Sequence, residues 1–275
     1  MQIQCIALDL DQTTLDETGL LSPGNRMALE RAIARGVHIV IASGRPFGSL
    51  PKTVLDIPGI EYAITSNGAA VYYIPTAARL HSYILTPDSV REIMRLTAGE
   101  PVVYEAFIDG IAYAHAPYVK DPVRFGATEQ AIGYIQRTRH PVDDMPAFID
   151  EHIHELDSLD IIVDDDTVRD RIWSMLETHV PDIYVTSSVR QLIEISHRDA
   201  GKHSGVRFVT ELLNISPAQV AAFGDGDNDA DMLAYVGCGI AVANASPACM
   251  AAADCVTLDY REDGVAHGIY HILHI

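Results

Sequence analysis

The first part of the chain alternates short apolar runs with helix signals. Residues 3–10 are apolar at every position except Gln4 and Asp9, which is typical of a strand buried on both faces of a sheet. Ser22 supplies an N-cap and Pro23 a first helical residue for the helix that follows. Further apolar runs at 37–42 and 62–65 predict two more buried strands. Strands that alternate with helices predict a doubly wound parallel sheet.

The pattern changes between residues 84 and 190. Thr86 and Pro87 begin a predicted helix, and two strand runs flank Asp109-Gly110, a dipeptide typical of hairpin turns. The other elements predicted in this stretch are strands at 160–163, 183–186 and 191–195 and a helix at 167–179. Hairpins mixed with helices predict a smaller α+β domain inserted at about 84–190.

The parallel pattern returns in the last part of the chain. The elements predicted there are helices at 202–213 and 228–235 and strands at 220–223, 239–243 and 256–258. We therefore expect residues 1–83 and 191–275 to form one Rossmann-like α/β core, with residues 84–190 inserted into it as a cap domain.

Composition narrows the choice of partners and compartment. The 275 residues are 48% hydrophobic, which is enough for a sizeable core. The net charge of −19, from 19 basic and 38 acidic residues, disfavours nucleic acid or an anionic membrane as a partner. No stretch approaches the ~20 apolar residues of a membrane span, and no signal peptide is recognisable. The four cysteines lack paired spacing, so we expect free thiols in a soluble cytoplasmic protein.

Several conspicuous residues of the insert have simple structural interpretations. The acidic run at 150–170 is interpreted as a solvated face rather than a binding surface. His152 and His154 have the spacing of a possible transition-metal pair, but ordinary surface positions are favoured. Trp173 is expected in the core of the insert rather than on a stacking platform.

Polar residues gather where the predicted parallel strands end. In open parallel sheets, ligands bind beyond the carboxyl ends of the strands. Asp9 and Asp11 follow the first strand, and residues two apart in extended chain project to the same side. Two close carboxylates repel unless a cation or a shared proton relieves them, and a hard divalent cation with oxygen ligands is the simplest relief. The other strand ends carry Ser43, Asn67, Asp225, Asn228 and Asp229.

This set suits phosphoryl transfer, in which the site must neutralise and position a charged group. Asp9 is the candidate nucleophile, and it would form an acyl phosphate. Asp11 is the candidate acid that protonates the leaving oxygen and then the base that activates water. Asp225 would complete the shell of a metal ion, with Asp229 as a ligand or a support for one.

Other residues would hold the phosphate. Lys202 is expected to neutralise phosphate oxygens and to keep the nucleophile ionised. Ser43 and neighbouring backbone amides, such as that of Gly44, are expected to donate hydrogen bonds to the transferring group. Arg45 has two open interpretations: it pairs with an acid such as Asp16, or it faces the substrate.

The acidic loop that begins at Asp225 also invites a calcium-loop interpretation. An EF-hand loop requires glycine at its sixth position and glutamate at its twelfth. Those positions hold Ala230 and Val236, so the spacing excludes an EF-hand.

Taken together, these segments resemble the motifs of the haloacid dehalogenase superfamily, specifically its Cof-like hydrolases, which carry an α/β cap between the second and third motifs. The matching segments are Asp9-Leu10-Asp11-Gln12-Thr13-Thr14-Leu15, Ile41-Ala42-Ser43-Gly44-Arg45-Pro46, Gly201-Lys202, Gly224 to Leu233, Thr65 to Ala69, and Glu262 to Ala266. The resemblance covers both core segments, and the insert matches it in position and size only.

The resemblance implies a site that agrees with the roles above. It implies Asp9 as the nucleophile, Asp11 as the acid/base, and Mg²⁺ held by Asp9, the backbone carbonyl of Asp11, and Asp225. It also places Asn228 near the phosphate and makes Asp229 a support, with Asn67 in a segment beside the site.

One segment departs from the family pattern. Gln12 stands where the family usually has glycine, and Thr14 occupies a leucine position. Glycine permits unusual backbone angles and close approach. Gln12 therefore would narrow the site, change the turn, or donate a hydrogen bond to the leaving group, which puts turnover rate and substrate preference in question.

Three functions are compatible with these residues. The favoured one is a Mg²⁺-dependent phosphatase for a sugar phosphate or similar phosphorylated metabolite. The alternatives are a phosphotransferase or phosphomutase that uses the same aspartyl-phosphate, and a non-catalytic phosphate-responsive binding protein. The sequence identifies neither the substrate nor the oligomeric state. Four polar or aromatic residues of the insert are unranked candidates for specificity: Tyr104, Glu105, Asp109 and Arg190.

Overall fold

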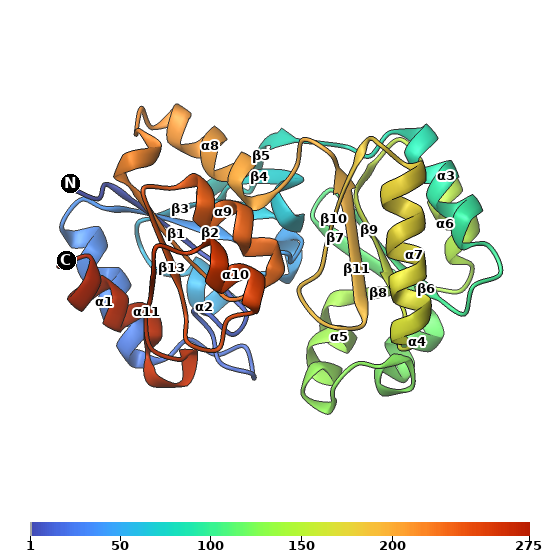
Figure 1. Cartoon of the computed structure of the whole chain (residues 1–275), viewed down its shortest axis with the longest axis horizontal. Coiled ribbons are helices and arrows are strands. Elements are labelled where there is room, and N and C mark those ends of the chain that lie inside the picture. Colours follow the sequence, from blue (N-terminus) through green and yellow to red (C-terminus); the bar gives the residue numbers. More distant parts are fainter. Residues whose placement is uncertain (1) are drawn as a thin grey trace. The chain divides into compact units, whose positions relative to one another are not determined.

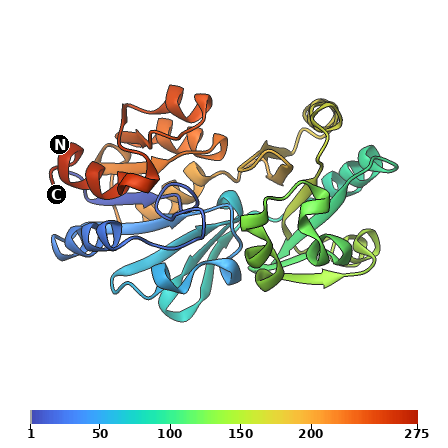
Figure 2. The ribbon, with the colours of Figure 1, turned by 90° about the horizontal axis from the view of Figure 1, so that it is seen from below.

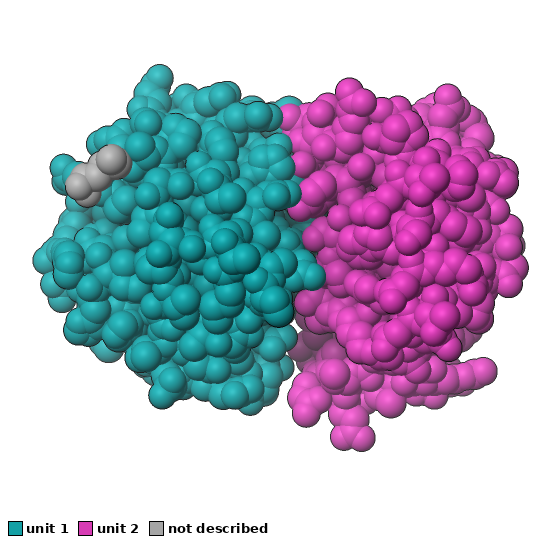
Figure 3. Space-filling model, in the orientation of Figure 1, with its two compact units in different colours: residues 1–45, 50–81, 201–275 teal, residues 46–49, 82–200 magenta. Residues whose placement is uncertain are grey.

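The computed structural model describes residues 2–275. These residues contain two β-sheets, and each sheet belongs to a separate unit (Figure 1, Figure 3). The first unit consists of the chain up to residue 45 and residues 50–81 and 201–275. The second consists of residues 46–49 and 82–200. The chain thus passes from the second unit to the first after residue 200, later than the predicted border at 191, because the strand at 192–197 pairs within the second sheet. The assignment of the units as catalytic core and cap stays a prediction.

The first sheet has eight strands in the order β14-β13-β12-β1-β2-β3-β4-β5. Its strands are β1 (Cys5–Leu8), β2 (His38–Ala42), β3 (Ile60–Thr65), β4 (Ala70–Tyr73), β5 (Ala78–Ser82), β12 (Val220–Gly224), β13 (Cys238–Ala241) and β14 (Cys255–Val256). All pairings from β14 through β3 are parallel, whereas β4 runs antiparallel to β3. The predicted parallel α/β core is confirmed, although β4 and β5 were not foreseen.

The central strand β1 lies between a strand from the first part of the sequence and a strand from the last part. Ile6 lies opposite Ile39 of β2 on one side and opposite Ala221 of β12 on the other. Strands from the first and last parts of the sequence therefore lie side by side, as the blue and orange segments of Figure 2 show. This order brings the carboxyl ends of β1, β2, β3 and β12 to one edge of the sheet.

Helices cover both faces of the first sheet. They are α1 (Pro23–Ala34), α2 (Lys52–Leu55), α8 (Lys202–Leu212), α9 (Ala230–Tyr235), α10 (Pro247–Ala252) and α11 (Gly264–His267). Helix α1 begins as predicted, because the Ser22 side chain accepts a hydrogen bond from the backbone N–H of Asn25. Helices α8, α9 and α10 pack with alternate residues of β1, β2 and β12 into one core, while α1 packs with α11.

The second sheet has six strands in the order β10-β11-β9-β6-β7-β8. They are β6 (Val103–Ile108), β7 (Ile111–His115), β8 (Arg139–Val142), β9 (Leu156–Ile162), β10 (Ile183–Thr186) and β11 (Leu192–His197). The hairpin predicted between β6 and β7 is present, and Asp109 and Gly110 adopt φ angles of 48° and 77°. These left-handed angles suit a tight hairpin turn.

Each face of the second sheet has its own apolar cluster. Helices α3 (Pro87–Thr97), α6 (Met145–Glu151) and α7 (Asp166–His179) contribute to one cluster, against which Trp173 packs as predicted. Helices α4 (Ala116–Lys120) and α5 (Ile132–Thr138) contribute to the other. The segment from 116 to 151 was not predicted in any detail.

The interpretation of the acidic run at 150–170 as a solvated face is wrong for its middle. Strand β9 carries Asp157 and Asp160 into the interior, where both side chains are buried. Asp160 accepts a hydrogen bond from Ser158 at 2.8 Å and lies in register with Glu105 and Glu194 of the adjacent strands. Burial, with the charges of those two neighbours, raises the pKa of Asp160 well above its usual range.

All four cysteines have free thiols. The His152 ring contacts the Glu155 carboxylate at 3.2 Å, and neither His152 nor His154 joins a three-ligand group among residues 2–275. Within the same residues, no helix combines the length and the apolar character needed to cross a bilayer.

Candidate active site

The buried ammonium of Lys202 is the centre of the site. Lys202 is the first residue of α8, and only 1% of its surface is exposed. Its Nζ donates to Asp9 Oδ1 at 2.6 Å and to Asp229 Oδ1 at 2.7 Å. Although burial alone would lower it, these two carboxylates raise the pKa of Lys202 above its ordinary value. Lys202 is therefore charged and held between residues that lie far apart in the sequence.

Asp9 directly follows β1, at the edge where the parallel strands end. Its backbone N–H donates to the carbonyl of Phe223 in β12 at 3.0 Å, and its own carbonyl accepts from the Thr14 hydroxyl at 2.6 Å. Thr14 stands where the haloacid dehalogenase motif that the sequence resembles has leucine, and its hydroxyl holds the backbone carbonyl of Asp9. Lys202 engages Oδ1 and leaves Oδ2 without a hydrogen-bond partner within residues 2–275.

The loop after β12 contributes two more carboxylates. Asp229 accepts hydrogen bonds at Oδ2 from the backbone N–H groups of Asp225 and Gly226, both at 3.0 Å. Asp225 accepts at Oδ1 from the Thr13 hydroxyl at 2.7 Å. The two bonds to Asp229 close the loop around its side chain. The bond from Thr13, which belongs to the first motif, orients Asp225. Sequence reasoning did not single out Thr13, although its place in the first motif was the available signal.

Negative charge is in excess at this point. Asp9, Asp225 and Asp229 each offer an oxygen within 4.8 Å of the others, and they form the one three-ligand acidic group found in residues 2–275. Three carboxylates and the single ammonium of Lys202 give a net charge of −3 + 1 = −2 when all are ionised. A divalent cation would balance this charge, and its preferred ligands are oxygens.

The titration behaviour of the acids reflects the same excess. Burial and the nearby Asp229 charge raise the pKa of Asp9 well above its usual range, against the opposing effect of Lys202. Burial and Asp229 raise the pKa of Asp225 to about 7. Protons therefore take up the charge that a cation would neutralise, so the donor set fits a divalent metal ion.

Arg45 pairs with an acid, which is one of the two interpretations left open by the sequence, but the acid is Asp11. The guanidinium donates through Nε to Asp11 Oδ2 at 2.8 Å and through Nη2 to Oδ1, a bidentate ion pair. Asp16, the acid named as an example from the sequence, instead accepts at Oδ1 from Thr18 and Leu20 in its own turn. Asp11 is half-exposed, and both of its oxygens are engaged in this state.

Asn67 links the remaining motifs through three hydrogen bonds. Its N–H donates to the carbonyl of Ser43 at 3.2 Å, and its carbonyl accepts from the N–H of Gly201, next to Lys202, at 2.8 Å. Its Oδ1 accepts from Asn228 Nδ2 at 2.9 Å. Asn67 adopts a left-handed φ of 52°, which asparagine tolerates better than most residues. The backbone and side chain of this one buried residue thus connect three segments.

The predicted phosphate holders lie on these segments. Ser43 is buried after β2, and its Oγ accepts from the N–H of Arg45 at 3.1 Å, while half-buried Gly44 forms the bend between them. Gly68 must be glycine, because a Cβ there would lie 2.0 Å from the carbonyl oxygen of Gly201. All ten site residues predicted from the sequence therefore lie in the first unit, on segments joined by hydrogen bonds and ion pairs or by direct chain continuity.

Gln12 adopts a left-handed backbone with φ of 57° and is exposed. Its carbonyl accepts from Asn244 Nδ2 at 2.9 Å, which holds the turn in place. This is the conformation that glycine adopts without strain and that costs other residues about 1 kcal/mol.

We predict that Gln12→Gly raises the free energy of unfolding by about 0.5–1 kcal/mol, because glycine relieves the left-handed strain. Urea unfolding of wild type, Gln12→Gly and Gln12→Ala measures it. The alanine variant keeps the strained backbone and should match wild type. A glycine variant less stable than wild type would show that the Gln12 side chain stabilises the turn by more than its strain.

A second prediction concerns pH in the absence of metal. Because its pKa is raised to about 7, the Asp225 carboxyl binds its proton more tightly in the folded protein than in the unfolded chain. This difference stabilises the fold fully below about pH 4, and the stabilisation is lost as pH rises through about 7. Asp225→Asn keeps an oxygen for Thr13 and removes the charge, so it should exceed wild type in unfolding free energy by on the order of 1–3 kcal/mol at pH 8 and by much less at pH 5. Urea unfolding in EDTA measures this difference, and a gap that is the same at both pH values contradicts the assignment.

Comparison with known proteins places the chain in a family. Residues 6–269 match the family model of haloacid dehalogenase-like hydrolases. The chain is 29% identical over 272 residues to the putative phosphatase YxeH of Bacillus subtilis, covering 98% of this chain and 97% of that protein. It is 26% identical over 273 residues to the Bacillus subtilis 5-amino-6-(5-phospho-D-ribitylamino)uracil phosphatase YcsE, covering 98% and 96%.

Solved structures agree with this placement. A haloacid dehalogenase-like hydrolase from B. subtilis superposes with a TM-score of 0.85 at 25% identity, covering 98% of this chain and all of that one. The subclass IIB sugar phosphatase BT4131 shares the fold with a TM-score of 0.83 at 20% identity, covering 99% and 100%. Because the family model spans nearly the whole sequence, this chain belongs to the haloacid dehalogenase-like hydrolases.

Proposed function

We propose that the chain is a Mg²⁺-dependent phosphatase that hydrolyses a small phosphate monoester, such as a sugar phosphate or a phosphorylated polyol, through a phosphoryl group carried on Asp9. The observation that carries this proposal is the Lys202 bridge, which orients Asp9 beside Asp225 and Asp229 and leaves one Asp9 oxygen free. Relatives named as phosphatases, among them YcsE and YitU of Bacillus subtilis, which act on a phosphorylated ribityl compound, support the substrate class.

Asp9 acts as the nucleophile in this mechanism. Oδ2 attacks phosphorus, the bond between phosphorus and the ester oxygen breaks, and the leaving alcohol departs with a proton. Lys202 fixes the Asp9 carboxylate and brings positive charge beside the transferring phosphoryl group. A water molecule then attacks the acyl phosphate, which releases inorganic phosphate and restores the carboxylate.

Asp11 supplies and recovers the proton. It donates to the leaving oxygen in the first half of the reaction and accepts a proton from water in the second. Since Arg45 occupies both Asp11 oxygens in this structure, acid catalysis requires Asp11 to leave that ion pair. The bidentate state is therefore a resting arrangement of the carboxylate.

Asp9, Asp225 and the backbone carbonyl of Asp11 would hold the Mg²⁺ ion, with Asp229 supporting them through its hydrogen bonds to the loop. The ion neutralises charge on the phosphate oxygens when it is bound. Ser43, the amide of Gly44, and Asn228 would bind the phosphate from the other strand ends, where Asn67 positions them.

The decisive experiment is hydrolysis of p-nitrophenyl phosphate in Mg²⁺. Asp9→Asn should lower kcat by on the order of 10³-fold or more, and Asp11→Asn by about 10²–10⁴-fold, because one loses the nucleophile and the other the proton donor. Asp227→Asn is the matched control, since Asp227 lies in the same acidic loop but is exposed, and its side chain accepts a hydrogen bond from Ser246, which lies outside the proposed site. An Asp9→Asn enzyme with the wild-type rate would refute the mechanism.

The substrate class needs a separate measurement. Release of inorganic phosphate across a panel of phosphorylated sugars, polyols and nucleotides should favour a sugar or polyol phosphate by kcat/KM. If nucleotides were preferred, the chemistry would stand and the substrate class would be wrong.

A further inference from the structure

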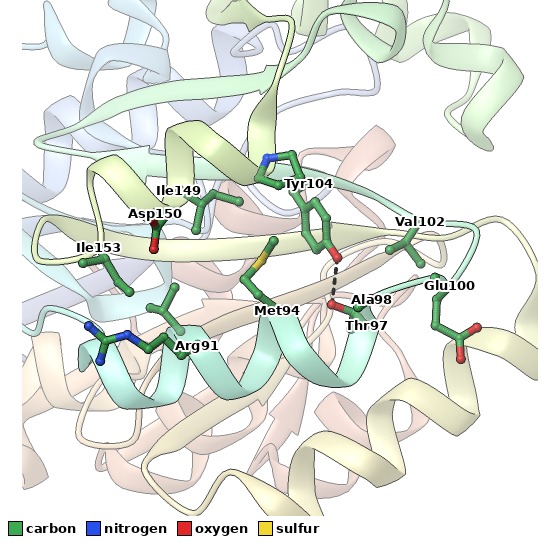
Figure 4. Close-up of a pocket in the computed structure, with 13 residues that line it drawn as sticks. Arg91, Met94, Thr97, Ala98, Glu100, Val102, Tyr104, Ile149, Asp150 and Ile153 are labelled. Carbon is green, nitrogen blue, oxygen red and sulfur yellow. Dashed lines mark hydrogen bonds between the residues drawn. The ribbon is translucent and has the colours of Figure 1, made fainter.

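A cavity of about 480 Å³ opens in the second unit between α3 and α6, with strand β6 at its base (Figure 4). None of its lining residues belongs to the site proposed above. They come from α3 and the loop after it, from β6, and from α6 and the residues after it. Its volume falls in the range of about 300–1,000 Å³ that is typical of small-molecule sites.

The walls of this α3/α6 cavity are apolar. Val90 and Met94 come from α3, Ile149 comes from α6, and Ile153 follows α6. Val102 and the ring of Tyr104 contribute further apolar surface. Such walls favour a ligand with a compact apolar body, because burying it removes apolar surface from water.

Tyr104 presents an acceptor to this space. The Thr97 hydroxyl donates to the carbonyl of Ile93 at 2.8 Å, so its proton is already used. The bond of 2.7 Å between Thr97 Oγ1 and Tyr104 Oη therefore takes its proton from Tyr104. With its own proton engaged, the Tyr104 oxygen can only accept a further hydrogen bond. A dashed line in Figure 4 marks the bond between Thr97 and Tyr104. A matching ligand must bring a donor.

The charges at the mouth balance except for one. Arg91 pairs with Asp88 at 3.0 Å, and Glu100 pairs with Arg171. Asp150 is exposed at the rim and has no ion pair or hydrogen bond from its side chain within residues 2–275. The C-terminal end of α3, at residues 97–99, adds partial negative charge to the lining. The uncompensated charge of the cavity is thus negative.

We propose that the α3/α6 cavity binds a small molecule that carries one ammonium group on an aromatic or branched apolar body. The apolar walls would receive the body, Asp150 would attract the charge, and the Tyr104 oxygen and the α3 carboxyl end would accept its hydrogen bonds. This site is separate from the proposed catalytic residues and does not depend on the phosphatase assignment.

The probe pair is 2-phenylethylamine and 3-phenylpropionate, which share a ring and carry opposite charges at about pH 7. Full-length protein with ¹³C-methyl methionine reports binding through the Met94 resonance, which Met94→Leu assigns among the seven methionines. The amine should shift the Met94 signal in a saturable way, and the carboxylate should not. Failure of the amine to saturate, or equal affinity of the two probes, would overturn the proposal.

Two variants locate the binding. Asp150→Asn should weaken the amine by about two- to fivefold, which is the effect of one exposed ion pair, and should leave thermal unfolding unchanged. Met94→Trp should fill the cavity and abolish binding while p-nitrophenyl phosphate hydrolysis persists. Because Asp150 is exposed, its variant decides the matter even if the tryptophan variant does not fold. Unchanged amine affinity in Asp150→Asn would contradict the role of that charge.

Discussion

The site depends on one buried ammonium shared by two carboxylates. Moving Lys202 out of water is costly, and its contacts to Asp9 and Asp229, at 2.6 and 2.7 Å, offset that cost. The same contacts connect the end of β1 to the start of α8 and to the loop after β12. Breaking a buried pair of this kind by removing one partner typically costs about 3–5 kcal/mol. The charge pattern that prepares the chemistry therefore also holds the strand ends together.

The ammonium does not neutralise the whole site. Asp225 is left with a hydrogen bond from Thr13 and a pKa raised to about 7, and Asp9 also resists ionisation because of burial and its acidic neighbours. A nucleophile must be ionised to attack, so the second counter-charge has to arrive from outside the chain. This explains in physical terms why a divalent cation and catalysis are expected to be linked here.

The backbone around the cluster is shaped to serve it. Asn67 and Gln12 both take left-handed conformations, and Gly68 leaves room for the carbonyl of Gly201. Asn67 uses its conformation to bond three segments at once, whereas Gln12 stays exposed and is held through its carbonyl. The turn therefore keeps its conformation with Gln12 in place of glycine, and the left-handed backbone of Gln12 carries strain that glycine would not have.

The parallel core was predictable because its signals are local. Buried apolar strands, the Ser22 cap, and the polar residues after each strand all follow from short-range patterns, and the order of a parallel sheet then brings those residues to one edge. The insert was harder to predict. Asp157 and Asp160 look solvated in the sequence, and only pairing of β9 between β6 and β11 buries them. The bidentate bond between Arg45 and Asp11 was also beyond the sequence, since it joins two loops through side-chain geometry.

Diffraction from crystals soaked in Mn²⁺ would show where the missing counter-charge binds, because the anomalous signal locates the ion without reference to activity. We expect one strong peak in contact with carboxylate oxygens of Asp9 and Asp225, absent from Asp225→Asn crystals, with Lys202 still bonded to Asp9. A peak elsewhere, or an ion that displaces Lys202 from Asp9, would contradict the charge balance proposed for this site.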